Sequence, residues 1–197
     1  MRLNMKWVLA GVSLVALVGL TAVQARGGVG GTAHDLSGNG WGTDQICKPC
    51  HTPHNANGSA GAPLWNHTVT SATFTLYSSP TLNATMGQPV GVSKLCLSCH
   101  DGTVAMDSFP GGSNSHTMTG DAMLGTNLSN DHPISFDYNA ALVALDPGLK
   151  DPATTGLPLY NGKLECATCH DVHNNTLDPF LRSTVVGSAL CLKCHNK

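Results

Sequence analysis

Short patterns of apolar and polar positions predict only small elements in this 197-residue chain. Residues 73–78 alternate polar and apolar side chains, which predicts a short strand, and the apolar run at residues 140–145 predicts one or two helical turns. Glycine, serine, asparagine and proline collect at residues 111–115 and 151–158, which we therefore predict to be loops. Residues 26–32 contain four glycines, so their ordering cost is high and we expect a flexible arm there.

The longest apolar run, at residues 7–23, follows Arg2 and Lys6 and is followed by Gln24 and Ala25. This order is typical of a cleavable export signal. A membrane anchor is the alternative, but the uninterrupted apolar core is shorter than the ~20 residues that a spanning helix usually needs. We predict a signal peptide at residues 1–25 and a mature domain at residues 26–197 with no membrane span. The mature domain should lie outside the cell or at the cell surface, or alternatively in the periplasm.

The composition leaves little material for a conventional hydrophobic core. Aromatic residues make up 5% and charged residues 11% of the chain, which also contains 22 glycines and 11 prolines. Removal of the signal peptide would leave 8 basic and 12 acidic residues, so the mature domain is mildly acidic. Nucleic acid is therefore not an expected partner.

All eight cysteines lie in four copies of the pentapeptide Cys-x-x-Cys-His. Two thiols two residues apart can reach the two vinyl groups of one porphyrin, and the adjacent imidazole can bind its iron, so each copy predicts one covalently bound haem c. Paired zinc sites or four disulfides would also use such cysteines, but neither explains the histidine that follows every pair. In order along the chain, the first to fourth motifs are Cys47, Cys50 and His51; Cys96, Cys99 and His100; Cys166, Cys169 and His170; and Cys191, Cys194 and His195.

The four predicted haems are expected to supply much of the protein core. The mature domain has 172 residues, or 43 for each haem, and segments of that size bury too little area to offset their ordering entropy. The predicted fold is therefore a multihaem cytochrome, with few short α-helices at the haem motifs and mostly irregular chain wrapped around a stacked haem core. The first cysteines of successive motifs are 49, 70 and 25 residues apart, so the last two haems should form a tight pair.

Six histidines lie outside the motifs, and four of them would give every iron a second imidazole. His54 and His173 each follow a motif histidine by three residues. That spacing is too short to reach the opposite face of the same haem, so each should ligate a neighbouring one, and for His173 we predict the haem of the fourth motif. His132 precedes a proline, a stiff setting that suits a fixed ligand.

The other spare side chains are expected to have no role at the irons. His67 and His116 lie in polar segments and are predicted to be bystanders. Methionine can also ligate haem iron. Because histidines are sufficient, packing roles are favoured for Met86, Met106, Met118 and Met123.

Several segments together resemble a known family. They include His34-Asp-Leu-Ser, Pro63-Leu-Trp-Asn, Asn130-Asp-His-Pro-Ile-Ser and the residues that follow the first three motifs. The series resembles the paired-CxxCH tetrahaem c-type cytochromes and is similar to the filament-forming outer-surface members from metal-reducing bacteria. The resemblance implies a head-to-tail filament in which one ligand crosses between subunits. It also implies bis-histidine haems whose distal ligands are His34, His54, His132 and His173.

These features favour electron transfer outside the cell, without enzymatic activity, to redox partner cytochromes or extracellular electron acceptors. The alternatives are a multihaem reductase in which one haem keeps an open site, and a monomeric periplasmic shuttle. His34 follows the glycine-rich arm, whose extended residues can span up to ~3.3–3.6 Å each, so we expect His34 to serve a haem of the adjacent subunit. The alternative is that His34 folds back onto a haem of its own subunit.

Overall fold

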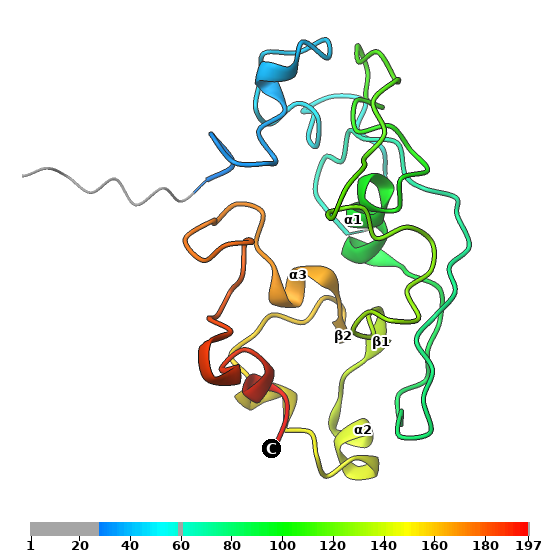
Figure 1. Cartoon of the computed structure of the whole chain (residues 1–197), viewed down its shortest axis with the longest axis vertical. Helices are drawn as coiled ribbons and strands as arrows, with labels where there is room; N and C mark the ends of the chain where they lie inside the picture. The colour runs from blue at the N-terminus through cyan, green and yellow to red at the C-terminus, as the bar shows by residue number, and fades with distance from the viewer. Residues whose placement is uncertain (1–27, 59–60, 197) are drawn as a thin grey trace, which may run out of the picture.

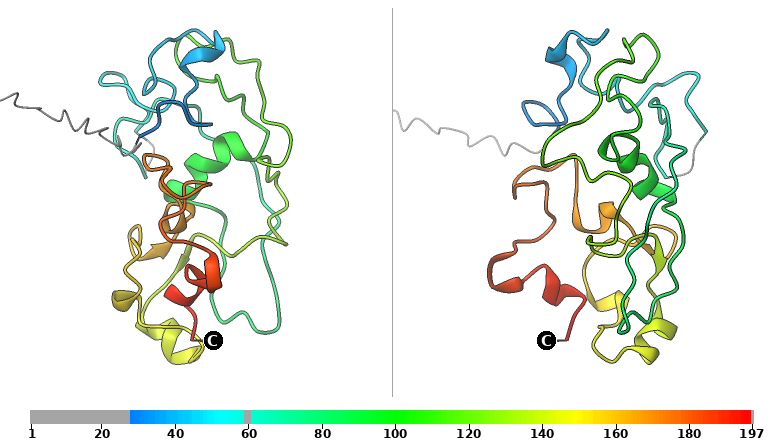
Figure 2. Two further views of the ribbon diagram at one scale, coloured as in Figure 1. Left: turned by 60° about the vertical axis from the view of Figure 1, so that its left-hand side comes forward. Right: turned by 45° about the vertical axis from the view of Figure 1, so that its right-hand side comes forward.

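A computed structural model describes residues 28–58 and 61–196 of the chain (Figure 1). The predicted signal peptide, residues 1–25, lies outside these residues. Within the described ranges, no helix combines the length and apolar character needed to cross a membrane. The molecule is elongated, with the segment after residue 28 at one end and the C-terminal segment at the other in all three ribbon views (Figures 1 and 2).

The expectation of few short helices and mostly irregular chain is confirmed. Three α-helices are described, α1 (Gly91–His100), α2 (Ala140–Leu145) and α3 (Cys166–Cys169). The one two-stranded sheet among the described residues pairs β1 (Phe136–Asp137) with β2 (Lys163–Leu164) in antiparallel register. Single turns of 3-10 helix occur at Ser37–Asn39, Pro152–Thr154, Val186–Ser188 and Cys191–Lys193.

The helix predicted at residues 140–145 is confirmed as α2. The side chain of Asn139 caps its first turn by accepting a 3.0 Å hydrogen bond from the amide of Leu142. The loop predicted at residues 151–158 contains a short 3-10 turn, which the Asp151 carboxylate caps by accepting a 2.9 Å hydrogen bond from the amide of Ala153.

The strand predicted at residues 73–78 is wrong. The segment forms only an isolated bridge between Thr75 and Asn127. The side chain of Gln88 accepts from the amide of Phe74 at 2.8 Å and donates to its carbonyl oxygen at 2.9 Å. One side chain therefore satisfies the backbone groups that a partner strand would otherwise bind.

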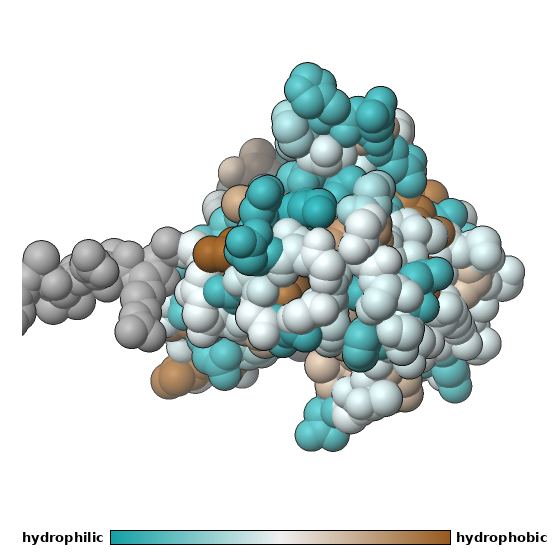
Figure 3. Space-filling view, turned by 90° about the horizontal axis from the view of Figure 1, so that it is seen from above, coloured by the Kyte–Doolittle hydropathy of each residue, from teal (hydrophilic) through white to brown (hydrophobic). Residues whose placement is uncertain are grey.

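The hydrophobic core consists of two small clusters that Ile134 joins. One contains Phe136, Tyr138, Leu142 and Leu164, and the other contains Phe74, Leu97 and Leu128. On the face drawn in Figure 3, strongly hydrophobic residues are scattered among neutral and hydrophilic ones. The thin core agrees with the composition.

A buried carboxylate joins α1 to α3. Glu165 is 1% exposed, and its Oε2 accepts hydrogen bonds from the amide of Ser93 at 3.2 Å and the hydroxyl of Ser135 at 2.9 Å. Glu165 also forms a capping box with Thr168 at the start of α3, and the amide of Cys166 donates to Ser93 Oγ at 2.9 Å. These bonds bring the cysteine motif on α1 and the one on α3 to a single junction (Figures 1 and 2).

Close approach to this carboxylate requires glycine at position 91. Gly91 has φ +51°, and a Cβ there would lie 3.2 Å from Glu165 Oε1. Any other residue would combine backbone strain with a tight contact at the first residue of α1.

Candidate haem-binding sites

Each motif begins with a turn that brings its three functional side chains together. The amide of the motif histidine donates to the carbonyl of the first cysteine in three motifs, at 2.8 Å for His51, 3.0 Å for His170 and 3.0 Å for His195. In the second motif, α1 continues to His100. Residues three and four positions apart lie on one face of such a turn, so both thiols and the imidazole project to the same side.

Backbone carbonyls hold three motif imidazoles in a defined state. The Nδ1 atoms of His51, His100 and His170 lie 2.9, 2.8 and 2.9 Å from the carbonyl oxygens of Pro63, Ala122 and Pro179. A carbonyl can only accept, so Nδ1 carries the hydrogen and Nε2 presents its lone pair. In metal sites, a carbonyl that accepts from Nδ1 orients the histidine ring so that Nε2 can bind the metal.

Three spare histidines lie opposite motif histidines. The ring centroids are 6.1 Å apart for His34 and His100, 6.3 Å for His51 and His173, and 6.4 Å for His132 and His195. Two imidazoles on opposite faces of one metal, with bonds of about 2.0 Å and about 1.2 Å more from each nitrogen to its ring centre, place the centroids ~6.4 Å apart. The three pairs therefore fit a metal bound between their rings.

The partner of His173 differs from our expectation. His173 lies opposite His51 of the first motif and not at the fourth motif. The reason is the turn after His170, in which Asp171 Oδ1 accepts from the amide of His173 at 3.1 Å. Arg182 fixes that turn by donating to Asp171 Oδ2 at 2.9 Å and to the carbonyl of Ala167 at 2.8 Å.

His34 also differs from our expectation, because it lies against His100 of its own chain. Its ring packs edge-on against Phe180, with the centroids 4.7 Å apart. The structure thus places His34 as in the alternative, in which the N-terminal segment folds back onto its own subunit.

The surroundings of His34 suit a ligand. Its Nδ1 is buried without a hydrogen-bond partner. The pKa of His34 is lowered, mainly by burial and to a smaller extent by the nearby rings of His100, His170 and His173. The lower pKa favours the neutral imidazole, which is the form that binds metals.

His170 and His54 are the two ligand candidates that the structure does not bring together with a partner ring. Across residues 28–58 and 61–196, neither ring lies against another histidine ring. His54 is exposed, and its backbone carbonyl accepts from the hydroxyl of Thr52 at 2.9 Å.

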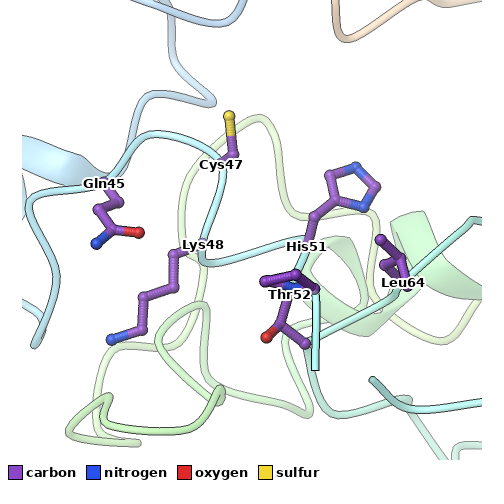
Figure 4. Close-up of a pocket in the computed structure, with 7 residues that line it drawn as sticks. Gln45, Cys47, Lys48, His51, Thr52 and Leu64 are labelled. Atoms are coloured by element: carbon purple, nitrogen blue, oxygen red, sulfur yellow. The ribbon is translucent and has the colours of Figure 1, made fainter. Parts of the chain in front are cut away.

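Open cavities lie beside the first and fourth motifs. One, of about 430 Å³, is lined by Gln45, Lys48 and Leu64 together with Cys47 and His51. Figure 4 shows the Cys47 thiol and the His51 ring projecting to the same side, while Lys48 points away. The other, of about 450 Å³, is lined by Gly187, Ser188, Cys191, Leu192 and His195. Both volumes fall within the range of cofactor pockets.

The thiols order the motifs in space. All eight cysteines are free. Burial, with the charge of Cys47, raises the pKa of Cys50 to about 11, and burial, with the charges of Cys50 and Asp101, raises the pKa of Cys99 to about 12. Both thiols are thus largely buried, and the effect of Cys50 on Cys99 agrees with the first and second motifs being neighbours.

The second and third motifs touch. A hydrogen bond with the Cys166 thiol, followed by burial, raises the pKa of Cys96. Burial first, and then the charge of Cys194, raise the pKa of Cys169, so the third motif also neighbours the fourth. The motifs therefore follow one another in space in their chain order. The second and third motifs are separated by the longest gap in the sequence. They nevertheless touch, because the Glu165 junction joins α1 to α3.

The two histidines predicted to be bystanders do not face motif histidines, and both are held by hydrogen bonds or ring contacts. His67 is 2% exposed, with Nδ1 2.7 Å from the carbonyl of Thr68 and Nε2 2.9 Å from that of Ala105. His116 stacks on Trp41, with the centroids 4.7 Å apart, and its Nδ1 lies 2.8 Å from Asp107 Oδ2.

Asp107, which the sequence did not single out, organises the loop around His116. Its side chain is fully buried and accepts from the Ser113 hydroxyl and from the amides of Ser115 and His116. Burial alone would raise the pKa of Asp107, but the hydrogen bonds from Ser113 and His116 outweigh burial and hold the pKa well below its usual range.

Comparison with known proteins supports the haem assignment. A family model described as the doubled CXXCH motif matches residues 158–197, which contain the third and fourth motifs. A search of curated proteins finds no match. The family match supports a multihaem c-type cytochrome, in which such motifs attach haem covalently and the haems carry electrons.

Proposed function

We propose that the mature chain binds four haem c groups and transfers electrons through them, with a histidine on each face of every iron. The proposal depends above all on the three histidine pairs at 6.1–6.4 Å, each of which joins one motif histidine to one predicted distal ligand. When bound, haem supplies one-electron chemistry at its iron. The residues of the chain hold the imidazoles, exclude exchangeable ligands and set the order of the sites.

The arrangement favours electron transfer over catalysis. A pair of imidazoles leaves no coordination position for a substrate, and the carbonyls of Pro63 and Ala122 hold His51 and His100 in the tautomer that binds metal. The order of the thiols gives a path from the first motif to the fourth. The terminal thiols Cys47 and Cys191 are both exposed, so each end of the path can meet a partner.

The third motif is where the candidate functions differ. His170 needs a second ligand, and the exposed His54 is the predicted distal ligand that remains. We propose that His54 of one copy completes the site of His170 in the next copy. Such a head-to-tail contact does not close on itself, so repetition produces a filament.

This assembly agrees with the resemblance to the outer-surface multihaem cytochrome E of metal-reducing bacteria. Export by the predicted signal peptide would deliver the filament outside the cell, where extracellular acceptors or redox partner cytochromes would take its electrons.

A reductase is the second candidate, and the unmatched ring of His170 is the observation that favours it. If no histidine completes this site, its iron keeps a position at which a substrate can bind. The monomeric periplasmic shuttle shares the other three sites and differs only in assembly.

Replacement of His54 in the exported full-length chain separates these candidates. His54→Ala should leave one high-spin haem in each subunit and abolish filaments in electron micrographs. His116→Ala is the matched control, because His116 is also partly exposed but bonded to Asp107, and it should leave both unchanged. Normal filaments from His54→Ala would refute the inter-subunit ligand. A carbon-monoxide-binding haem in the wild-type protein would favour the reductase.

A further inference from the structure

We propose that the axial imidazole planes of the first, second and fourth motifs are set at increasing angles, which makes the three haems electronically distinct and directs electrons toward the fourth motif. This inference rests on the bis-histidine function proposed above.

The angle between paired rings widens along the path. The interplanar angle is 21° for His51 and His173, 51° for His34 and His100, and 72° for His132 and His195. The centroid distances differ by only 0.3 Å across the three pairs, between 6.1 and 6.4 Å. The pairs thus share one spacing and differ in the angle between their ring planes.

Separate contacts fix the rotation of the rings. The Nδ1 of His51 faces the carbonyl of Pro63 at 2.9 Å, and the Nδ1 of His100 faces that of Ala122 at 2.8 Å. The Nδ1 of His132 lies 2.9 Å from the carbonyl of Pro133, the residue that follows it. Because these carbonyls belong to different segments, one ring of each pair is oriented independently of the other pairs.

The angle matters because the π orbital of an imidazole stands perpendicular to its ring. Parallel rings act on the same iron d orbital, raise it above its partner, and stabilise the oxidised state by placing its unpaired electron there. Crossed rings raise both d orbitals equally, so this stabilisation is lost and the two orbitals are nearly degenerate. Crossing therefore raises the reduction potential, and it enlarges the maximum g value in electron paramagnetic resonance.

The three angles consequently rank the sites. As far as the ring angle sets the reduction potential, the site of His51 and His173 has the lowest reduction potential and that of His132 and His195 the highest. Each electron that passes along the path oxidises one iron from ferrous to ferric and reduces the next from ferric to ferrous, so charge balances at every step. Electrons that enter beside Cys47 would move toward Cys191.

Electron paramagnetic resonance of the oxidised, exported protein tests the ranking. We expect the three histidine-paired sites to give three low-spin classes besides that of the third motif, and among these three the class with the largest maximum g value should be reduced first as the potential is lowered. His132→Met should remove that class, and His173→Met should remove the class with the smallest value. In either variant the methionine sulfur can serve as the sixth ligand of the iron. The titration of the wild-type protein tests the ranking without the variants.

The possible results separate the inference from the function. A single low-spin class, or a largest-g class that is reduced last, would overturn the inference and leave bis-histidine ligation intact. High-spin signals from the histidine-paired sites would overturn the proposed function, and the inference with it.

Discussion

Glu165 offers the sharpest test of how the fold brings two haem motifs together. It is buried at the junction of α1 and α3, where its carboxylate accepts from Ser93, Ser135 and the amide of Thr168. Glu165→Ala would leave these three donors without their acceptor. Glu165→Gln would keep one carbonyl oxygen and replace the other by a donor.

The magnitude follows from the number of donors. An unpaired buried donor costs about 1–3 kcal/mol, so three donors give roughly 3–9 kcal/mol before relaxation. Since the Ser135 hydroxyl can rotate to another acceptor, two donors remain unpaired and we expect about 2–6 kcal/mol for Glu165→Ala. Glu165→Gln loses one bond to a carboxylate and should cost about 1.5–3 kcal/mol.

Asp137→Asn is the matched control, because this carboxylate pairs with Lys163 on the same small sheet but is 64% exposed. An exposed pair contributes about 1 kcal/mol or less. The free energy of unfolding would be measured by denaturant titration of the haem-loaded chain. Circular dichroism in the Soret region would report coupling between neighbouring haems, and Glu165→Ala should weaken that signal.

The account of the junction would be refuted if Glu165→Ala unfolded within about 1 kcal/mol of the wild type, the range of the surface control, and kept the same Soret couplet.

Three further predictions follow from the other polar contacts. Asp107→Asn should lower the free energy of unfolding by about 1.5–3 kcal/mol at neutral pH. The pKa of Asp107 is lower in the folded than in the unfolded state, so its stabilisation is present above the unfolded pKa near 3.8 and is lost as the pH falls. The stabilities of wild type and variant should therefore converge in acid titrations. Arg182→Gln should release the Asp171 turn and loosen His173, giving a partial high-spin signal from the first motif alone, and an unchanged spectrum would contradict that role. His67→Ala should lower the free energy of unfolding by about 1–3 kcal/mol, because it leaves the carbonyl of Thr68 or Ala105 without its donor, but it should leave every haem low-spin; a new five-coordinate haem would show that His67 is a ligand.

The sequence was sufficient for features that depend on local chemistry. The four Cys-x-x-Cys-His motifs, the helix at residues 140–145 and the thin core could all be read from spacing and composition. His132, predicted from its stiff setting to be a distal ligand, lies with its ring 6.4 Å from that of His195.

Features that depend on long-range contacts could not be read in the same way. The backbone of residues 73–78 looked like a strand, but Gln88 satisfies Phe74 from a distant loop. The choice of His51 over the fourth motif as the partner of His173 depends on the bond from Arg182 to Asp171. Likewise, nothing adjacent to Glu165 or Asp107 in the sequence indicates that each carboxylate is buried among hydroxyl and amide donors.

The central claim is that two histidines hold each iron, and carbon monoxide binding to the fully reduced, exported protein tests it most directly. With His34, His132 and His173 opposite their motif histidines and His54 supplied by a neighbouring copy, every haem should be low-spin in both redox states and none should bind carbon monoxide. Rapid uptake of carbon monoxide by any of the four haems would contradict the account.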